Sequence, residues 1–227
     1  MTDKELYNNN GYLLFNTNID HELLDNIKDT VINPKDQRVQ DIWQSNNFVK
    51  ELALHKNITH KLFELYQDKP LAFQTLNFKK GTQQKAHSDT IHFNTYPENN
   101  MCGVWVALED IDMNNGPLVY YPGSHKDHRY NMQDFNLEPT EDNYKKYEEC
   151  LLKEISKQGY VPRYATMKKG EAIIWAANLL HGGSKVKDKT RTRYSQVTHY
   201  FFESELYYTP MLSSVNNLCI RKPNWIL

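Results

Sequence analysis

The feature that most restricts the fold of this chain is a change of sequence pattern at Leu71. Beyond it, short apolar or alternating stretches are separated by turn residues such as Gly, Pro and Asn, a pattern typical of strands and turns. Five such stretches are predicted strands: Leu71–Lys79, Met101–Glu109, Leu118–Tyr121, Ala172–Trp175 and Arg193–Phe202. Many short strands joined by turns predict a β sandwich or barrel.

The geometry of two of these regions can be predicted further. Asn114–Pro117 is a hairpin signal between the second and third stretches. In the last stretch, successive side chains must point to opposite faces of the sheet. One face is predicted to carry Arg193, Ser195, Val197, His199 and Phe201, and the other Tyr194, Gln196, Thr198, Tyr200 and Phe202.

The first 70 residues are largely helical in pattern, apart from a short predicted strand at Gly11–Phe15. A helix is predicted after Asp20, whose carboxylate can cap the first turn, and Pro34 is expected to end it. Apolar residues three or four positions apart predict two more helices, at Asn46–Leu54 and Asn57–Gln67. We expect these helices to cover one face of the strands that follow.

Residues 126–162 interrupt the strands as a helical insertion. Thr140 is expected to begin a helix that Gly159 and Pro162 end. Its apolar positions, spaced by three and four, are Tyr144, Tyr147, Leu151 and Ile155. Two interpretations remain open: a helix packed on the sheet edge, or a lid over a substrate pocket. With residues 203–227 as a C-terminal tail, the chain 1–227 is expected to be a single domain.

The composition disfavours several classes of partner. A net charge of −1 provides no strong field for nucleic acid or an anionic membrane. The longest apolar runs are far shorter than a membrane span, and the first residues lack the features of a signal peptide. The widely spaced Cys102, Cys150 and Cys219 predict free thiols in a reducing compartment. The expected location is therefore the cytoplasm, and the oligomeric state is left open.

His87, Asp89 and His181 are the strongest candidates for a metal site. Residues two apart at a strand end can reach one ion, and a histidine from a later strand can complete the set. Two imidazoles and one carboxylate on one face of an ion, with open positions opposite, are typical of non-haem Fe(II) oxygenases. The His-x-Asp spacing occurs again at His125 and Asp127, so the spacing alone is not specific.

Several linked motifs resemble the phytanoyl-CoA dioxygenase family. They are a tryptophan-bearing strand at Trp105–Ile111, an NG turn at Asn115–Leu118, and the sequence PGSHK at Pro122–Lys126. The first His-x-Asp pair precedes them, and His181–Ser184 follows, with an arginine on the last core strand. The resemblance extends from about Leu71 to Phe202. One departure is the sequence HGGS at the second histidine, where the family is nearer HGSG, which leaves the role of Ser184 open.

The resemblance implies a fold, a cofactor and an activity. The fold would be mainly β with flanking helices, a double-stranded β-helix also called a cupin-like jelly roll. The ligands of Fe(II) would be His87, Asp89 and His181, because His125 lies in the family's structural PGSHK turn. With 2-oxoglutarate and O2 as cosubstrates, the favoured reaction is hydroxylation of an unactivated C–H bond of a small molecule, with release of succinate and CO2.

Further site residues follow from the residues and the resemblance together. Arg193 suits the far carboxylate of 2-oxoglutarate because its planar fork can form two charge-assisted bonds. Arg191 is the alternative, but it lies in the charged turn before the strand. Trp105, Asn77 and Gln84 are further candidates for contacts with the cosubstrate. His92, close behind the dyad, is a candidate for contact with the substrate.

Two rival functions use the same barrel. A metal-dependent isomerase or hydrolase would keep the three ligands but would not need Arg193. A non-catalytic module that binds a small ligand would have no reason to keep the complete triad. The presence of both the triad and the arginine favours the oxygenase over either rival.

Overall fold

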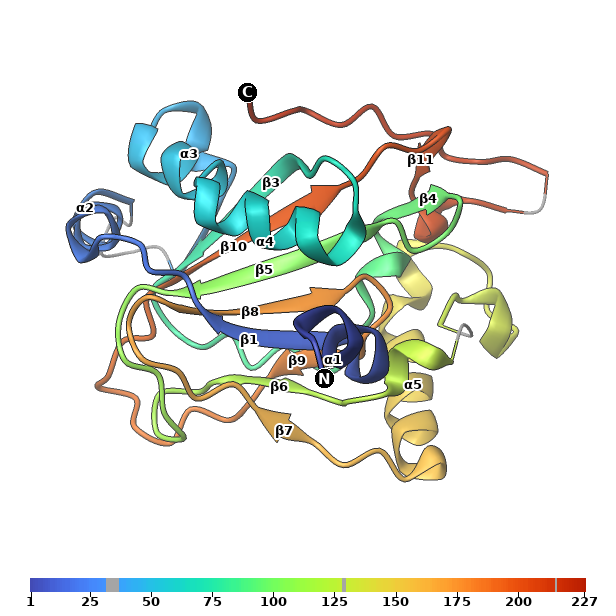
Figure 1. Cartoon of the computed structure of the whole chain (residues 1–227). Coiled ribbons are helices and arrows are strands. Elements are labelled where there is room, and N and C mark those ends of the chain that lie inside the picture. Colours follow the sequence, from blue (N-terminus) through green and yellow to red (C-terminus); the bar gives the residue numbers. More distant parts are fainter. Residues whose placement is uncertain (32–36, 128–129, 215) are drawn as a thin grey trace.

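The centre of the molecule is a six-stranded antiparallel sheet (Figure 1). The computed structural model describes residues 1–31, 37–127, 130–214 and 216–227. The order of strands across this major sheet is β1-β8-β5-β10-β3-β2. In chain order, the strands are β1 (Tyr12–Asn16), β2 (Arg38–Gln40), β3 (Leu71–Phe78), β5 (Met101–Ala107), β8 (Glu171–Ala176) and β10 (Ser195–Phe201). Each of the five predicted stretches beyond residue 70 contains a strand.

A smaller sheet and a two-stranded ribbon lie beyond the major sheet. The smaller sheet has the order β7-β6-β9, and β4 pairs with β11. These strands are β4 (Asn94–Tyr96), β6 (Leu118–Tyr120), β7 (Arg163–Tyr164), β9 (His181–Gly183) and β11 (Leu206–Tyr208). The hairpin predicted at Asn114–Pro117 is wrong, because β5 and β6 belong to different sheets. A local turn signal cannot tell whether the chain returns to the same sheet or crosses to another.

Four helices cover the outer face of the major sheet (Figure 1). They are α1 (Asp3–Asn10), α2 (His21–Val31), α3 (Asn47–Ala53) and α4 (Lys56–Tyr66). Buried leucines and isoleucines of α2, α3 and α4 join the helix-facing side chains of β5, β8 and β10 in one apolar cluster. This arrangement confirms the prediction that the helical part covers one face of the strands.

The local signals at the helix ends explain where most of these helices start. The Asp20 carboxylate accepts a hydrogen bond from the Glu22 N–H at 3.0 Å, directly before α2. Pro34, the predicted end of this helix, lies outside the described residues. The sequence analysis missed α1, although Thr2 and Glu5 form a capping box that is visible as T-x-x-E. It also missed β2, a three-residue edge strand.

The helix of the insertion, α5 (Tyr144–Gln158), ends at Gly159 as predicted. Its face of Tyr147, Leu151 and Ile155 is buried in an apolar cluster that includes Ile91 and Leu180. The Tyr147 hydroxyl donates to the Tyr130 carbonyl at 2.6 Å. The helix is therefore packed in the described structure, and because Tyr144 at its start lines the cavity, the lid interpretation stays a prediction.

Both ends of the chain are integrated into the sheets. The N-terminal 70 residues supply β1 and β2, which are the two edges of the major sheet. In the tail, β11 pairs with β4, and the Ile226 N–H donates to the Ala72 carbonyl at 2.8 Å. None of the described helices is long and apolar enough to cross a membrane.

Candidate metal centre

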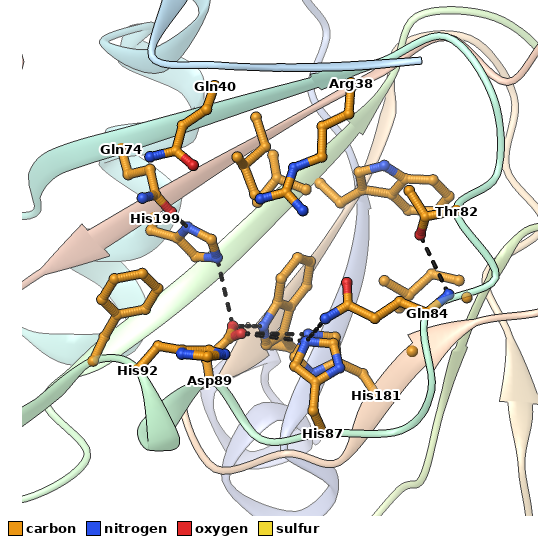
Figure 2. Close-up of a pocket in the computed structure, with 18 of the residues that line it drawn as sticks. Arg38, Gln40, Gln74, Thr82, Gln84, His87, Asp89, His92, His181 and His199 are labelled. Atoms are coloured by element: carbon orange, nitrogen blue, oxygen red, sulfur yellow. Dashed lines mark hydrogen bonds and ion pairs between the residues drawn. The ribbon is translucent and has the colours of Figure 1, made fainter. Parts of the chain in front are cut away.

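Three candidate ligand atoms converge at one end of the space between the sheets. One ligand atom from each of His87, Asp89 and His181 lies within 4.8 Å of the others, and all three residues are buried. The His87 and His181 backbones form reciprocal N–H to carbonyl bonds of 2.9 and 3.0 Å. Figure 2 shows both imidazoles and the carboxylate directed at the same point. The Asp89 Oδ1 lies 3.8 Å from His87 Nε2 and 3.6 Å from His181 Nε2.

Backbone carbonyls fix the tautomers of both histidines. The Nδ1 of His87 lies 2.9 Å from the Lys85 carbonyl, and the Nδ1 of His181 lies 2.9 Å from the Leu179 carbonyl. A carbonyl oxygen can only accept, so each Nδ1 carries a proton and donates it. Each Nε2 is then left with a lone pair that faces Asp89, which is how metal-binding histidines are normally oriented.

Burial and the neighbouring histidines together set the charge states that a metal needs. Desolvation, with His181 nearby, lowers the pKa of His87 to about 4, so its imidazole is neutral at pH 7. Burial opposes ionisation of Asp89, but His181 and His199 outweigh it and hold the pKa of that carboxyl well below its usual range. One carboxylate and a neutral imidazole are therefore ready at pH 7 to act as ligands.

Two residues that the sequence analysis did not single out hold the second oxygen of Asp89. The Trp175 indole N–H donates to Asp89 Oδ2 at 2.7 Å, and His199 Nε2 lies 3.5 Å from the same oxygen. Gln74 Oε1 in turn contacts His199 Nδ1 at 3.0 Å. These contacts leave Oδ1 directed at the histidines and fix the carboxylate in place. The alternation of β10 did put His199 on the same face as Arg193, and that signal could have found it.

A cavity of about 560 Å³ extends from the triad between the sheets. Arg193 lines it and is buried, with its guanidinium 5.0 Å from the Trp105 ring and 5.3 Å from the Phe78 ring. One guanidinium nitrogen donates to the Lys80 carbonyl at 3.2 Å, and another lies 3.4 Å from Ser195 Oγ. Its buried Nε has no partner, and Arg193 forms no ion pair with any residue that the structure describes.

An arginine in this state is suited to a negatively charged ligand. Burial lowers the pKa of Arg193 to about 10, so the side chain is still charged at pH 7. A buried charge without a counter-ion is costly, and a carboxylate in the cavity would remove that cost. Arg191 differs, because it pairs with Asp112 at 2.6 Å on the surface and does not line the cavity.

The cavity wall includes three of the four other predicted residues. Trp105, Gln84 and His92 line the cavity. Gln84 Nε2 lies 3.4 Å from His87 Nε2, and His92 Nε2 lies 3.4 Å from the Tyr144 hydroxyl at the start of α5. Burial, with His87 nearby, lowers the pKa of His92 to about 4.

Asn77 requires a correction, because it does not line the cavity. Its amide donates to Gln196 Oε1 at 3.1 Å on the helix-facing side of the major sheet. The physical reason is the alternation of β3, in which Leu76 and Phe78 line the cavity and the residue between them must face away.

The second His-x-Asp pair lies apart from the triad. His125 is part of the single helical turn Ser124–Lys126, and its Nε2 contacts the Asn8 carbonyl at 3.0 Å. Its own carbonyl accepts from the Asn178 amide. Within the described parts of the chain, the His87 triad is the one cluster of three residues with metal-ligand spacing.

The sequence HGGS has a structural explanation. A Cβ on Gly182 would lie 2.8 Å from the Gln84 carbonyl oxygen, and one on Gly183 would lie 2.8 Å from the Gln83 nitrogen. The two glycines thus let β9 approach the loop that carries His87. The Ser184 hydroxyl donates to the Pro117 carbonyl at 2.7 Å, so it serves a backbone contact and does not line the cavity.

The fold and the triad define a jelly-roll protein with a candidate mononuclear metal site. A sequence model of the phytanoyl-CoA dioxygenase (PhyH) family matches residues 7–192, so the chain belongs to this family. A Danio rerio relative, phytanoyl-CoA dioxygenase domain-containing protein 1, is 29% identical over 191 residues, which are 76% of this chain and 60% of the relative. The peroxisomal phytanoyl-CoA dioxygenase of Mus musculus is 32% identical over 114 residues, covering 48% of this chain and 31% of the relative. The chain therefore spans less than two thirds of the length of these relatives.

Solved structures confirm the predicted jelly roll. The structure resembles SnoK, a non-haem α-ketoglutarate-dependent carbocyclase of nogalamycin biosynthesis, with a TM-score of 0.71 and 13% identity; the match covers 91% of this chain and 84% of the other. It also resembles EctD from S. alaskensis, crystallised with 2-oxoglutarate and 5-hydroxyectoine, with a TM-score of 0.69 and 17% identity; that match covers 97% and 83% of the two chains. At these identities, the likeness establishes the fold.

Proposed function

We propose that this chain is an Fe(II)/2-oxoglutarate-dependent dioxygenase that hydroxylates an unactivated C–H bond of a small molecule and releases succinate and CO2. The observation that carries the proposal is the combination of a His-Asp-His triad with a buried arginine that lacks a counter-ion, both on the wall of one cavity. Family membership supports it, and so does the structural neighbour EctD, which was crystallised with Fe and with 2-oxoglutarate.

The donor set fits Fe(II). His87 and His181 would each offer Nε2, and Asp89 would offer Oδ1, while the open side of the triad faces the cavity. Bound iron would supply the redox chemistry that couples oxidative decarboxylation of 2-oxoglutarate by O2 to oxidation of a substrate C–H bond. Trp175 would keep the Asp89 carboxylate from rotating, because its indole N–H already occupies Oδ2.

The arginine fits 2-oxoglutarate. The Arg193 guanidinium lines the cavity and would bind the far carboxylate through its terminal N–H groups. Trp105 and Phe78 lie against the guanidinium and would exclude water from that ion pair. Gln84, next to His87, would contact the cosubstrate near the metal, and His92 on the opposite part of the wall would contact the substrate.

The same proposal treats residues 1–227 as one oxygenase domain. Because β1 and β2 form the two edges of the major sheet, the N-terminal 70 residues would be part of the barrel and not a separate unit. Residues 71–202 would supply the triad and the arginine, and the tail 203–227 would close one side of the cavity.

Calorimetric titration of 2-oxoglutarate into the Mn(II)-loaded protein tests the proposal. A hydrogen bond to a charged group contributes about 1.5–3 kcal/mol, so Arg193→Ala should weaken binding by roughly 10- to 150-fold or more. The affinity of Arg193→Lys for 2-oxoglutarate should lie between those of the wild type and Arg193→Ala, because lysine keeps the charge but lacks the planar fork. Arg191→Ala is the matched control and should bind 2-oxoglutarate like the wild type, since Arg191 is already paired with Asp112.

The outcome separates the proposal from its rivals. Unchanged affinity in Arg193→Ala together with a loss in Arg191→Ala would move the role to Arg191. No change in either variant would remove 2-oxoglutarate from the mechanism, and a metal-dependent isomerase, a hydrolase or a binding module would then account better for the triad.

A further inference from the structure

The C-terminal tail forms part of the cavity wall, although it lies beyond residue 192, where the family match ends. Thr209, Met211, Leu212 and Arg221 line the same cavity as the triad. The backbone of this segment is held in place by a hydrogen bond, in which the Arg221 N–H donates to the Tyr207 carbonyl at 2.8 Å. The tail therefore places its side chains at defined positions over the cavity.

Arg221 is a positioned cation that forms no ion pair with a described residue, although the Asp41 carboxylate attracts it from beyond ion-pair distance. Its guanidinium lies 4.6 Å from the centre of the Phe93 ring, and its Nε is buried without a hydrogen-bond partner. Its side chain forms no hydrogen bond or ion pair with any residue in the described ranges. Burial lowers the pKa of Arg221, yet a guanidinium remains protonated in proteins. The Phe93 ring, which also lines the cavity, holds the guanidinium against the cavity wall through a cation–π contact.

The charges along the cavity wall also favour a negatively charged ligand. Arg38, Arg193 and Arg221 line the cavity, and Asp89 is the one carboxylate among its described lining residues. None of the three arginines forms an ion pair with a described residue. In the proposed function, 2-oxoglutarate would occupy Arg193 and leave the other two arginines without an ion pair to a described residue. Arg38 of β2 is directed into the cavity, but it is exposed, so water screens its charge (Figure 2). Arg221 is half-buried and lies against the Phe93 ring.

We propose that Arg221 selects a substrate that carries an anionic group, a carboxylate or a phosphate monoester, which the guanidinium binds through two parallel hydrogen bonds. This inference rests on the proposed function, because it assigns Arg193 to 2-oxoglutarate and leaves Arg221 for the substrate. The exposed Arg38 would attract the same anion to the cavity mouth, and Phe93 would contact the carbon skeleton next to the anionic group.

Three probes of matched size test the proposal: benzoate, its neutral analogue benzamide, and phenyl phosphate. Each is titrated by calorimetry into the protein saturated with Mn(II) and 2-oxoglutarate, so that Arg193 is occupied and no turnover occurs. The wild type should bind at least one of the anions roughly 10- to 150-fold more tightly than benzamide. The tighter anion identifies the class, carboxylate or phosphate monoester.

The variants assign the contact to Arg221. Arg221→Gln should remove the preference for the anion, and Arg221→Lys should keep part of it. Arg163→Gln is the matched control, because Arg163 is an exposed arginine of β7 that does not line the cavity. It should behave like the wild type. Affinity for 2-oxoglutarate, measured in the same samples, should be unchanged in all three variants.

Two results would overturn the proposal. The first is that neither anion binds the wild type more tightly than benzamide, whether both bind weakly or not at all. The second is that Arg221→Gln retains the full preference for the anion. The failure of 2-oxoglutarate itself to bind would instead count against the proposed function, so the two failures are distinguishable.

Discussion

The two faces of β10 carry similar numbers of polar side chains but use them differently. On the helix-facing side, the Gln196 amide donates to a backbone carbonyl of α3 at 3.1 Å, and the Tyr200 hydroxyl donates to another at 2.7 Å. On the cavity-facing side, His199 turns towards the Asp89 carboxylate, and Arg193, two residues before the strand begins, keeps an unpaired Nε. Polar groups on the first face hold the fold together, whereas those on the second face orient a candidate metal ligand or line the cavity.

This difference between the two faces predicts that substitutions will affect either stability or ligand binding, depending on the face. A substitution on the helix-facing side should lower the free energy of unfolding and leave metal and ligand affinity intact in the folded protein. A substitution on the cavity side should weaken metal or ligand binding without lowering the free energy of unfolding. The reason is that removing a buried charge that lacks an ion pair relieves a cost of folding.

The largest effect on stability is expected for Leu62→Ala. Leu62 is fully buried in α4 within the cluster that covers the major sheet. Its truncation should lower the free energy of unfolding by about 2–5 kcal/mol, because a cavity remains in the core. Urea denaturation measures this loss, and Mn(II) affinity of the folded variant should match the wild type. Weaker metal binding with an unchanged free energy of unfolding would contradict the contrast between the helix-facing and cavity-facing sides.

His87→Ala should show the opposite behaviour. Loss of a metal ligand should lower Fe(II) or Mn(II) affinity by more than the roughly 10- to 100-fold typical of residues that only support a ligand. His125→Ala is the control, since His125 belongs to a separate turn. Metal content after anaerobic reconstitution checks both variants. Similar losses in the two would mean that the wrong His-x-Asp pair had been chosen.

The pH dependence of stability should also arise on the cavity side. In the metal-free protein, the pKa of His87 is about 4, below the ordinary value of 6.5. Between these two values the unfolded chain binds more protons than the folded one, so stability falls as the pH drops from 6.5 to 4. The expected loss from this group is about 1–3 kcal/mol.

Denaturation midpoints at several pH values can isolate that contribution. His87→Asn cannot be protonated and should reduce the dependence by the share of His87, leaving that of His92, whereas His60→Asn, on the exposed surface of α4, should not change it. A slope that persists unchanged in His87→Asn would show that the folded protein accepts a proton on His87 without penalty.

The smallest effect is expected in the insertion. Tyr147→Phe should cost about 0.5–1.5 kcal/mol, because it removes the buried hydrogen bond to the Tyr130 carbonyl. Since α5 is packed, the wild-type helix should resist limited proteolysis equally with and without 2-oxoglutarate. Protection that appears only after the cosubstrate is added would instead identify α5 as a lid.

The sequence was sufficient for features governed by periodicity and by linked motifs. Alternation predicted the two faces of β10, and motif order separated the first His-x-Asp pair from the second, a choice with which the convergence of His87, Asp89 and His181 agrees. The jelly roll came from the resemblance, because strand pattern alone does not distinguish one sandwich from another.

Other features depended on information that no local pattern contains. Asn77 was a candidate because its segment resembles the family strand before the dyad, and such a resemblance does not say which face of the sheet a side chain occupies. The turn at Asn114–Pro117 gave no sign that it crosses between sheets. The contact of Trp175 with Asp89 joins residues 86 positions apart. Arg221 is bonded through its backbone to β11, which in turn pairs with β4.

Anaerobic titration with Fe(II) and then 2-oxoglutarate, followed by visible absorption, tests the central claim most directly. The account predicts a weak charge-transfer band that appears only when both are present, because the triad and Arg193 would hold the metal and the cosubstrate in one cavity. The band should be lost in His87→Ala and should need a higher 2-oxoglutarate concentration in Arg193→Ala. Absence of the band in an iron-loaded wild type would contradict the account.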